Sequence, residues 1–207
     1  MRDTVDRQRR AFWLKHLHRW HWISSAVSLV VLLLFSVTGF TLNHAAGIEA
    51  APRVSQHAAI LPPALLRELT DSGKASAPVP SVIAEYVRAG TGARIDGRPG
   101  DWSEDEVYVS LPRPGGDSWV SIDRDTGEVQ YEVTDRGWLA WLNDLHKGRN
   151  TGPVWSVFID VFALACLVFA VTGLVLLKMH AAQRRMTWPM VALGFVLPAV
   201  IALVFIH

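Results

Sequence analysis

The sequence predicts an α-helical membrane protein with three transmembrane helices and a small extracytoplasmic α+β insert between the first two. Residues 23–42 carry no charge, and a helix of about 20 residues spans about 30 Å, the thickness of the apolar core of a bilayer. Two further apolar runs, 154–177 and 188–206, are interrupted only by Asp160 and by two prolines, which membrane helices tolerate. Between the first two runs, polar and apolar residues alternate over 105–133, which predicts strands.

Basic residues set the predicted orientation. They precede the first apolar run and separate the second from the third, so the positive-inside rule places both stretches in the cytoplasm. We therefore expect the N-terminus in the cytoplasm and the C-terminus on the outer side of the membrane. The net charge of +1 argues against nucleic acid as a partner. The predicted segments are a cytoplasmic basic N-terminus (1–21), transmembrane helix 1 (22–44), an extracytoplasmic domain (45–135), an interfacial helix (136–150), transmembrane helix 2 (152–178), a cytoplasmic loop (179–187) and transmembrane helix 3 (188–206).

The insert reads as a small domain of helices followed by strands. Residues 61–73 and 80–90 are amphipathic, and each stretch has proline near its start and glycine at its end, which predicts two short helices. Alternating strands are predicted at 105–111, 117–123 and 127–133, separated by turn sequences. They form an antiparallel meander with the helices on one face. Residues 137–146 carry a stripe of tryptophan and leucine that suits a helix lying in the membrane interface.

Two blocks of sequence recur in the same order, which predicts that the first two transmembrane helices form an inverted repeat. The blocks "LHR" (17–19) and "FSVTGFTL" (35–42) match "LHK" (145–147) and "FAVTGLVL" (169–176). A histidine follows each second block, His44 in the first unit and His180 in the second. Because the two helices run in opposite directions, the entry histidine of one unit meets the exit histidine of the other at one membrane face.

The repeat predicts two histidine pairs, His44 with His146 outside and His18 with His180 inside. Two neutral imidazoles on facing helices are the usual axial ligands of haem b. The chain has no CxxCH attachment motif, so the haem would be held non-covalently. We therefore predict one or two haem b groups with these four histidines bound to the iron. Zinc could use the same ligands, but it generally needs three or four.

Further candidates lie close to these pairs. Arg19 and Arg149 are near enough in sequence to bind haem propionates. His21 shares a helix face with His18 and is an alternative inner ligand, whereas His16 points away. Taken singly, histidines beside a membrane span are also common interfacial anchors.

Two features inside the apolar runs need an explanation. The glycines of the two VTG blocks, Gly39 and Gly173, would let a porphyrin or a neighbouring helix come close. Asp160 is an ionisable group within a span, and such groups usually have a partner or a function.

The motifs resemble the PepSY-associated transmembrane family. The resemblance covers about residues 13–185 and rests on the "LHRWHW" opening, the first VTG span, the insert ending in "IDRDTGEV", and "LHKGRNTG" before the second VTG span. It implies a PepSY-like fold for the insert and His18 and His146 as the pattern histidines of the family. It also implies kinship with haem-containing inner-membrane reductases, and with it a location in the bacterial inner (plasma) membrane with a cytoplasmic N-terminus and a periplasmic C-terminus. This chain departs from the larger members in having one such insert and three spans.

The resulting functional prediction is haem-mediated electron transfer across the membrane to a periplasmic acceptor. The resemblance implies a ferric siderophore or a flavinylated periplasmic protein as that acceptor. No glycine-rich nucleotide fingerprint follows a strand, so we expect a quinol or a cytoplasmic reductase as the donor. His18 and His44 are roughly 39 Å apart on a straight helix, and a homodimer is one way to supply a relay over that distance.

Two other classes compete with this prediction. The first is a non-redox membrane anchor, embedded in inner-membrane lipid, whose PepSY-like domain binds or restrains a periplasmic protein. The second, metal ion permeation, is weaker because the spans offer few polar ligands at mid-membrane.

Overall fold

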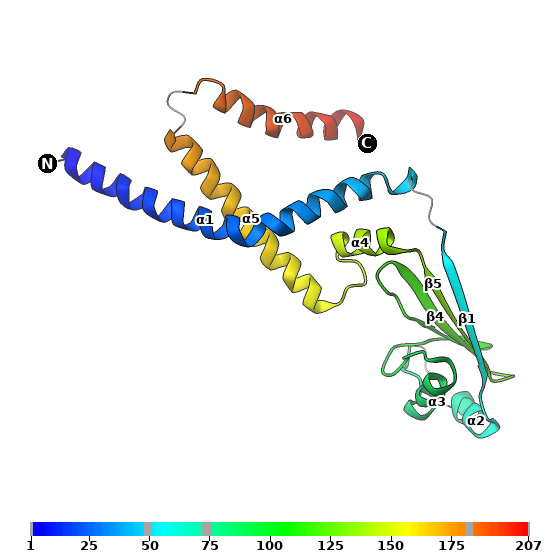
Figure 1. The fold of residues 1–207 in the computed structure, drawn as a ribbon. Helices are drawn as coiled ribbons and strands as arrows, with labels where there is room; N and C mark the ends of the chain where they lie inside the picture. The colour runs from blue at the N-terminus through cyan, green and yellow to red at the C-terminus, as the bar shows by residue number, and fades with distance from the viewer. Residues whose placement is uncertain (1, 48–50, 72–75, 181–183, 207) are drawn as a thin grey trace. The chain divides into compact units, whose positions relative to one another are not determined.

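The computed structural model describes residues 2–47, 51–71, 76–180 and 184–206 (Figure 1). The chain divides into two compact units, which we describe separately: a helical unit (Met1–Leu34 with Phe158–His207) and a domain unit (Phe35–Val157). The elements in chain order are α1 (Arg2–Asn43), a 3-10 turn (Ala45–Gly47), β1 (Arg53–Ile60), α2 (Pro63–Asp71), α3 (Ser81–Thr91), β2 (Asp101–Trp102), β3 (Glu106–Ser110), β4 (Gly116–Asp123), β5 (Glu128–Asp135), α4 (Trp138–Lys147), α5 (Pro153–His180) and α6 (Thr187–Phe205).

Three helices, α1, α5 and α6, are long and apolar enough to cross a membrane, as the sequence predicts. Helix α1 begins at Arg2 and continues without a break through the basic segment into the apolar run, because nothing between them breaks a helix. In the helical unit, α1 and α5 lie antiparallel, with His18 beside His180 and His21 beside Thr172.

Small polar residues line the buried part of the helical unit. Ser24, Ser28 and Thr172 are buried, and side chains of this size let two helices approach closely. Each hydroxyl donates to a carbonyl one turn earlier on its own helix: Ser24 to Trp20, Ser28 to Ser24 and Thr172 to Val168. These bonds satisfy the hydroxyls within the helix, which an apolar environment requires.

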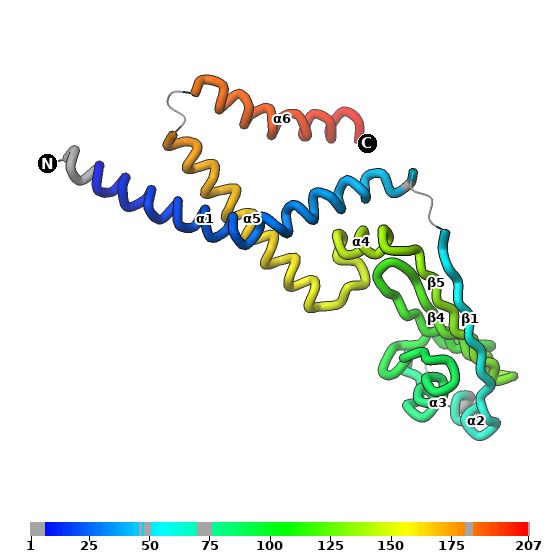
Figure 2. Tube along the Cα trace, in the orientation of Figure 1, coloured from blue at the N-terminus to red at the C-terminus, as the bar shows by residue number. Residues whose placement is uncertain are grey.

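The domain unit is built on a five-stranded antiparallel sheet with the order β1-β5-β4-β3-β2. Strands β3, β4 and β5 form the predicted meander, and buried and part-buried residues alternate along the whole of β4. Helices α2 and α3, both predicted, supply the rest of the core, and Figure 2 traces the chain from them into the strands. The fully buried core side chains are Leu69, Ile83, Val87, Ile95, Val107, Val109, Val120, Ile122 and Val129.

Two strands were missing from the prediction. The edge strand β1 pairs with β5 along its whole length, from Arg53 opposite Asp135 to Ile60 opposite Glu128. Nearly all of β1 is exposed, so its sequence shows no apolar alternation. Long-range contacts position it instead: an ideal Cβ on Gly90 of α3 would lie 3.1 Å from the Ala59 Cβ. The second missing strand, β2, has two residues, too few to produce a pattern.

Helix α4 is fixed to the turn between β3 and β4. The Gly115 amide donates to Asp144 Oδ2 at 2.8 Å. Gly115 has φ +76°, and an ideal Cβ on it would lie 2.7 Å from the Trp141 Cβ and 2.9 Å from the Trp141 backbone. The backbone of the turn therefore lies directly against the backbone of α4. Whether the apolar stripe of α4 meets a membrane stays a prediction.

This contact predicts that Gly115→Ala destabilises the domain unit far more than an alanine at another glycine with positive φ. The clash with α4 adds overpacking of about 2 kcal/mol to a backbone penalty of about 1 kcal/mol. Gly97→Ala is the matched control, because Gly97 has φ +66° and nothing within 4 Å of its ideal Cβ. Thermal unfolding of the purified chain measures both. Equal losses of Tm would mean that α4 does not pack against this turn.

Candidate functional site

The VTG block of α1 holds the side chain of His146. Thr38 Oγ1 lies 2.7 Å from His146 Nδ1, and the Phe35 ring packs on the imidazole with the ring centres 4.8 Å apart. An ideal Cβ on Gly39 would lie 3.4 Å from His146 Cε1, so the missing side chain makes room for the ring. The Thr38 hydroxyl donates to the Phe35 carbonyl. In the tautomer that carries its proton on Nδ1, His146 donates to the same hydroxyl.

The VTG block of α5 makes the same contacts with His21. Thr172 Oγ1 and the Phe169 carbonyl lie 3.0 Å and 3.2 Å from His21 Nδ1. The Phe169 ring stacks on the imidazole at 4.7 Å with an angle of 14° between the planes. An ideal Cβ on Gly173 would lie 3.1 Å from His21 Cε1. The Thr172 hydroxyl donates to Val168, so Nδ1 again carries the proton.

We call each set of phenylalanine, threonine and glycine a histidine cradle: Phe35, Thr38 and Gly39 on α1, and Phe169, Thr172 and Gly173 on α5. In each cradle the phenylalanine covers a ring, the threonine accepts its Nδ1 proton and the glycine leaves space for it. The sequence prediction assigned this space to a porphyrin or a helix, and the structure fills it with imidazole. The sequence repeat aligned His146 with His18. In the structure the residue that makes the equivalent contacts is His21.

His18 and His180 face each other within the helical unit. Their ring centres are 6.0 Å apart and their planes are at 87°. Each Nδ1 is 2.8 Å from the carbonyl one turn earlier on its own helix, Leu14 for His18 and Leu176 for His180. A carbonyl only accepts, so each Nδ1 carries a proton, and Nε2 is the ring nitrogen left to bind a metal.

The spacing of this pair suits one metal ion between the rings. With a metal–nitrogen bond of about 2 Å and a ring centre about 1 Å behind the nitrogen, two opposed imidazoles have centres about 6 Å apart. Both side chains are exposed on α1 and α5, which leaves them accessible to a cofactor.

An open apolar groove of about 520 Å³ lies on the same two helices, and neither His18 nor His180 is among its lining residues. Its lining includes Leu17 and Met179, each the immediate neighbour of one of the two histidines. Arg9 and Arg10 are part of the lining, whereas the sequence analysis proposed Arg19 as the inner cation. The remaining lining residues are Trp13 and Val175. Arg9, Arg10, Trp13 and Leu17 recur at intervals of three or four residues, which places them on one side of α1. This spacing is the sequence pattern that could have identified the groove.

The structure does not bring His44 and His146 together as the repeat predicts. His44 is exposed, stacks on Phe40 at 4.4 Å, and has its Nδ1 3.0 Å from the Phe40 carbonyl. It lies just beyond Asn43, the last residue of α1, whereas His146 contacts Phe35, Thr38 and Gly39 more than one turn earlier.

The remaining predicted residues are distributed as follows. His16 stacks on Phe12 at 4.3 Å, and His57 lies on β1 against Tyr131. Arg19, Arg149 and Asp160 are exposed. Their side chains therefore make no buried contact that would assign a role to them.

The α5 cradle predicts that Thr172→Val frees the His21 ring, whereas Thr172→Ser keeps it fixed. Valine removes the hydroxyl that accepts the Nδ1 proton, at a cost of about 1 kcal/mol, and serine retains it. Nitrogen-15 chemical shifts of histidine-labelled protein report the tautomer, and Tm reports the stability. The cradle would be refuted if the valine variant kept both the wild-type His21 shifts and the wild-type Tm.

Comparison with known proteins identifies the family. No curated protein and no solved structure matches the chain at a significant level. A sequence profile of the family described as "Putative PepSY_TM-like" matches residues 12–207, which include all three apolar helices and the whole domain unit. The chain therefore belongs to the PepSY_TM-like family of membrane proteins.

Proposed function

We propose that the protein transfers electrons across the bacterial inner membrane through a b-type haem held by His18 and His180. The facing pair carries this proposal, because its spacing and its protonation both suit two axial ligands of one iron. The haem, when bound, would supply the one-electron chemistry. The protein residues would hold it, orient it and determine its surroundings.

The groove on the same two helices supports haem as the ligand. A porphyrin needs an apolar environment for its ring and cations for its two propionates. The lining provides apolar side chains from both helices, Leu17 on α1 and Met179 on α5, and two guanidinium groups, Arg9 and Arg10. A zinc site would need further ligands beside the two histidines, and the haem supplies its own.

The orientation follows from the charges. Arg9 and Arg10 belong to the basic segment that the positive-inside rule places in the cytoplasm. The haem would then lie near the inner face, where a quinol or a cytoplasmic reductase can reduce it. The PepSY-like domain would face the periplasm, where the acceptor is a ferric siderophore or a flavinylated protein. The proposal includes one haem, because His18 and His180 are in direct ring contact, whereas His44 stacks on Phe40 and His146 packs on Phe35.

The two cradles support an inverted repeat as the origin of the helical core. The same three residue types make the same contacts in each, while α1 and α5 run in opposite directions. The repeat would then have fixed one imidazole near each end of the pair of helices. The exit histidines differ: His180 meets His18, and His44 stacks on its own helix.

The proposal predicts that the purified chain from haem-replete cells carries non-covalent haem with a low-spin, six-coordinate spectrum. His18→Ala and His180→Ala should each convert it to a five-coordinate form or lose it, because each removes one axial bond. His16→Ala is the control on α1 and should keep the spectrum, since its ring packs on Phe12. His21→Ala should keep the six-coordinate spectrum and lower Tm.

Two outcomes would overturn the proposal. A colourless protein with negative haem extraction would favour the non-redox anchor, in which the PepSY-like domain holds a periplasmic partner. A spectrum that survives in both His18→Ala and His180→Ala would show that the haem is bound elsewhere.

A further inference from the structure

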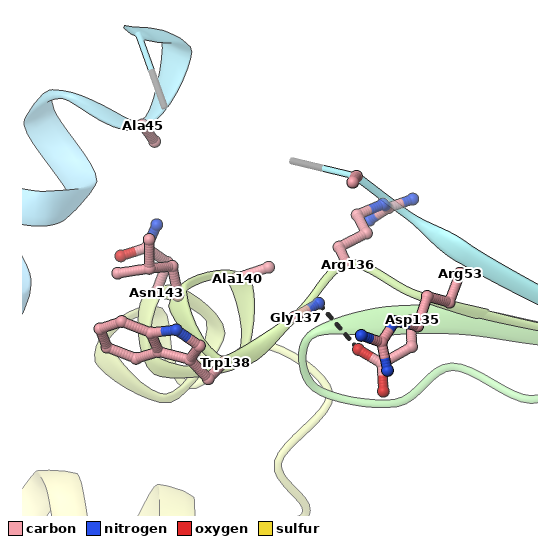
Figure 3. Close-up of a pocket in the computed structure, with 10 residues that line it drawn as sticks. Ala45, Arg53, Asp135, Arg136, Gly137, Trp138, Ala140 and Asn143 are labelled. Atoms are coloured by element: carbon pink, nitrogen blue, oxygen red, sulfur yellow. Dashed lines mark hydrogen bonds between the residues drawn. The ribbon is translucent and has the colours of Figure 1, made fainter. Parts of the chain in front are cut away.

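The domain unit contains a cavity of about 520 Å³ that the proposed electron transfer does not use (Figure 3). Its lining comes from the 3-10 turn that follows α1, the start of β1, the end of β5 and the first two turns of α4. Figure 3 shows Trp138, Ala140 and Asn143 on the α4 side and Arg53 on the strand side. Asn143 Oδ1 accepts a hydrogen bond from Thr41, which ties the α4 wall to α1.

The cavity is lined by two guanidinium groups, Arg53 and Arg136, and one carboxylate, Asp135. The protein already satisfies that carboxylate: the Gly137 amide donates to it at 2.8 Å, and Arg113 pairs with it at 3.4 Å. Arg136 pairs with Asp117, which lies outside the lining. Among the residues that the structure describes, no carboxylate is within ion-pair distance of Arg53. The cavity therefore has a cation available for an anionic ligand.

The rest of the lining is mostly apolar and includes the turn that follows α1. Ala45 follows the last residue of α1, a helix apolar enough to span a bilayer, by two positions. Ala51, Trp138 and Leu139 add apolar surface. A ligand that fits both parts has an anionic head for the guanidinium groups and an apolar body.

We propose that this cavity binds the phosphate group of a membrane phospholipid. Guanidinium is the side chain best suited to phosphate, because its fork donates two parallel hydrogen bonds. The position beside the end of α1 gives a lipid headgroup access to the cavity. A free phosphate compound presents the same chemistry and would meet the same side chains. The proposal does not depend on haem, since none of these residues belongs to the proposed haem site.

The test measures binding to the full detergent-purified chain with two probes. Native mass spectrometry with dioleoyl phosphatidylglycerol tests the lipid, and calorimetry with inorganic pyrophosphate tests the free phosphate. Arg53→Gln should weaken binding about tenfold, because it removes one charge-assisted contact. Arg67→Gln is the matched control: it removes an exposed arginine of α2, outside the cavity lining, and should leave binding unchanged.

A second variant acts in the opposite direction. Asp117→Asn releases Arg136 from its ion pair without removing a cation, so it should tighten binding several-fold. Asp125→Asn is its control, since it removes one exposed carboxylate from the turn at the other end of the β4–β5 hairpin. Opposite responses to Arg53→Gln and Asp117→Asn cannot both come from misfolding.

The outcomes separate the sources of phosphate. Arg53-dependent binding of the lipid alone supports the proposal as stated, and Arg53-dependent binding of both probes supports a phosphate site open to either source. Binding of pyrophosphate alone would overturn the lipid as the ligand. Failure of both probes to bind, or binding that Arg53→Gln and Asp117→Asn leave unchanged, would overturn the site. These binding measurements do not depend on whether haem is bound. The phosphate site can therefore be refuted while the haem proposal stands, and the reverse.

Discussion

The hydrogen bond between a threonine hydroxyl and an imidazole Nδ1 is the interaction on which the histidine arrangement depends. It occurs twice, Thr38 with His146 and Thr172 with His21. A glycine follows each threonine: an ideal Cβ would lie 3.1 Å from the His21 ring at Gly173, which is a tight contact, and 3.4 Å from the His146 ring at Gly39, which is an ordinary one. The bond joins segments far apart in the chain, α1 to α4 in the domain unit and α1 to α5 in the helical unit. The cradles therefore determine which residues of these helices face one another.

Three further histidines near helix ends also form a hydrogen bond through Nδ1, in their case with a backbone carbonyl. His18, His44 and His180 each have Nδ1 beside a carbonyl of their own helix. In these three histidines and in His21, Nδ1 is a donor to a carbonyl, which leaves Nε2 as the ring nitrogen that can bind a metal. An interfacial anchor needs no such uniformity, since water can satisfy either nitrogen. The uniform tautomer is what a metal ligand requires, and in the facing pair the second imidazole is already at a suitable distance. The groove on the same two helices adds apolar surface and two arginines.

Much of this architecture could be predicted from the sequence, and the failures have physical causes. The three apolar helices, α2, α3 and the meander of β3, β4 and β5 follow from local patterns of charge and hydrophobicity. Strand β1 does not, because its place is set by pairing with β5 rather than by its own side chains. The repeat identified the VTG blocks and the His18–His180 pair, but it aligned His146 with His18. The cradle contacts show that His21, one helical turn further on, is the counterpart. In the structure His44 stacks on Phe40 and His146 packs on Phe35, so their role as a haem pair stays a prediction.

Electron paramagnetic resonance of the oxidised protein tests the central claim most directly. The angle between two axial imidazole planes sets the splitting of the iron d orbitals, so the spectrum reports the geometry of the ligand pair. His18 and His180 have planes at 87°. The account therefore predicts a low-spin ferric signal of the strongly anisotropic type that perpendicular imidazoles produce, lost in His180→Ala. A rhombic signal typical of parallel imidazoles, a high-spin signal in the wild-type protein, or the absence of any haem signal would contradict it.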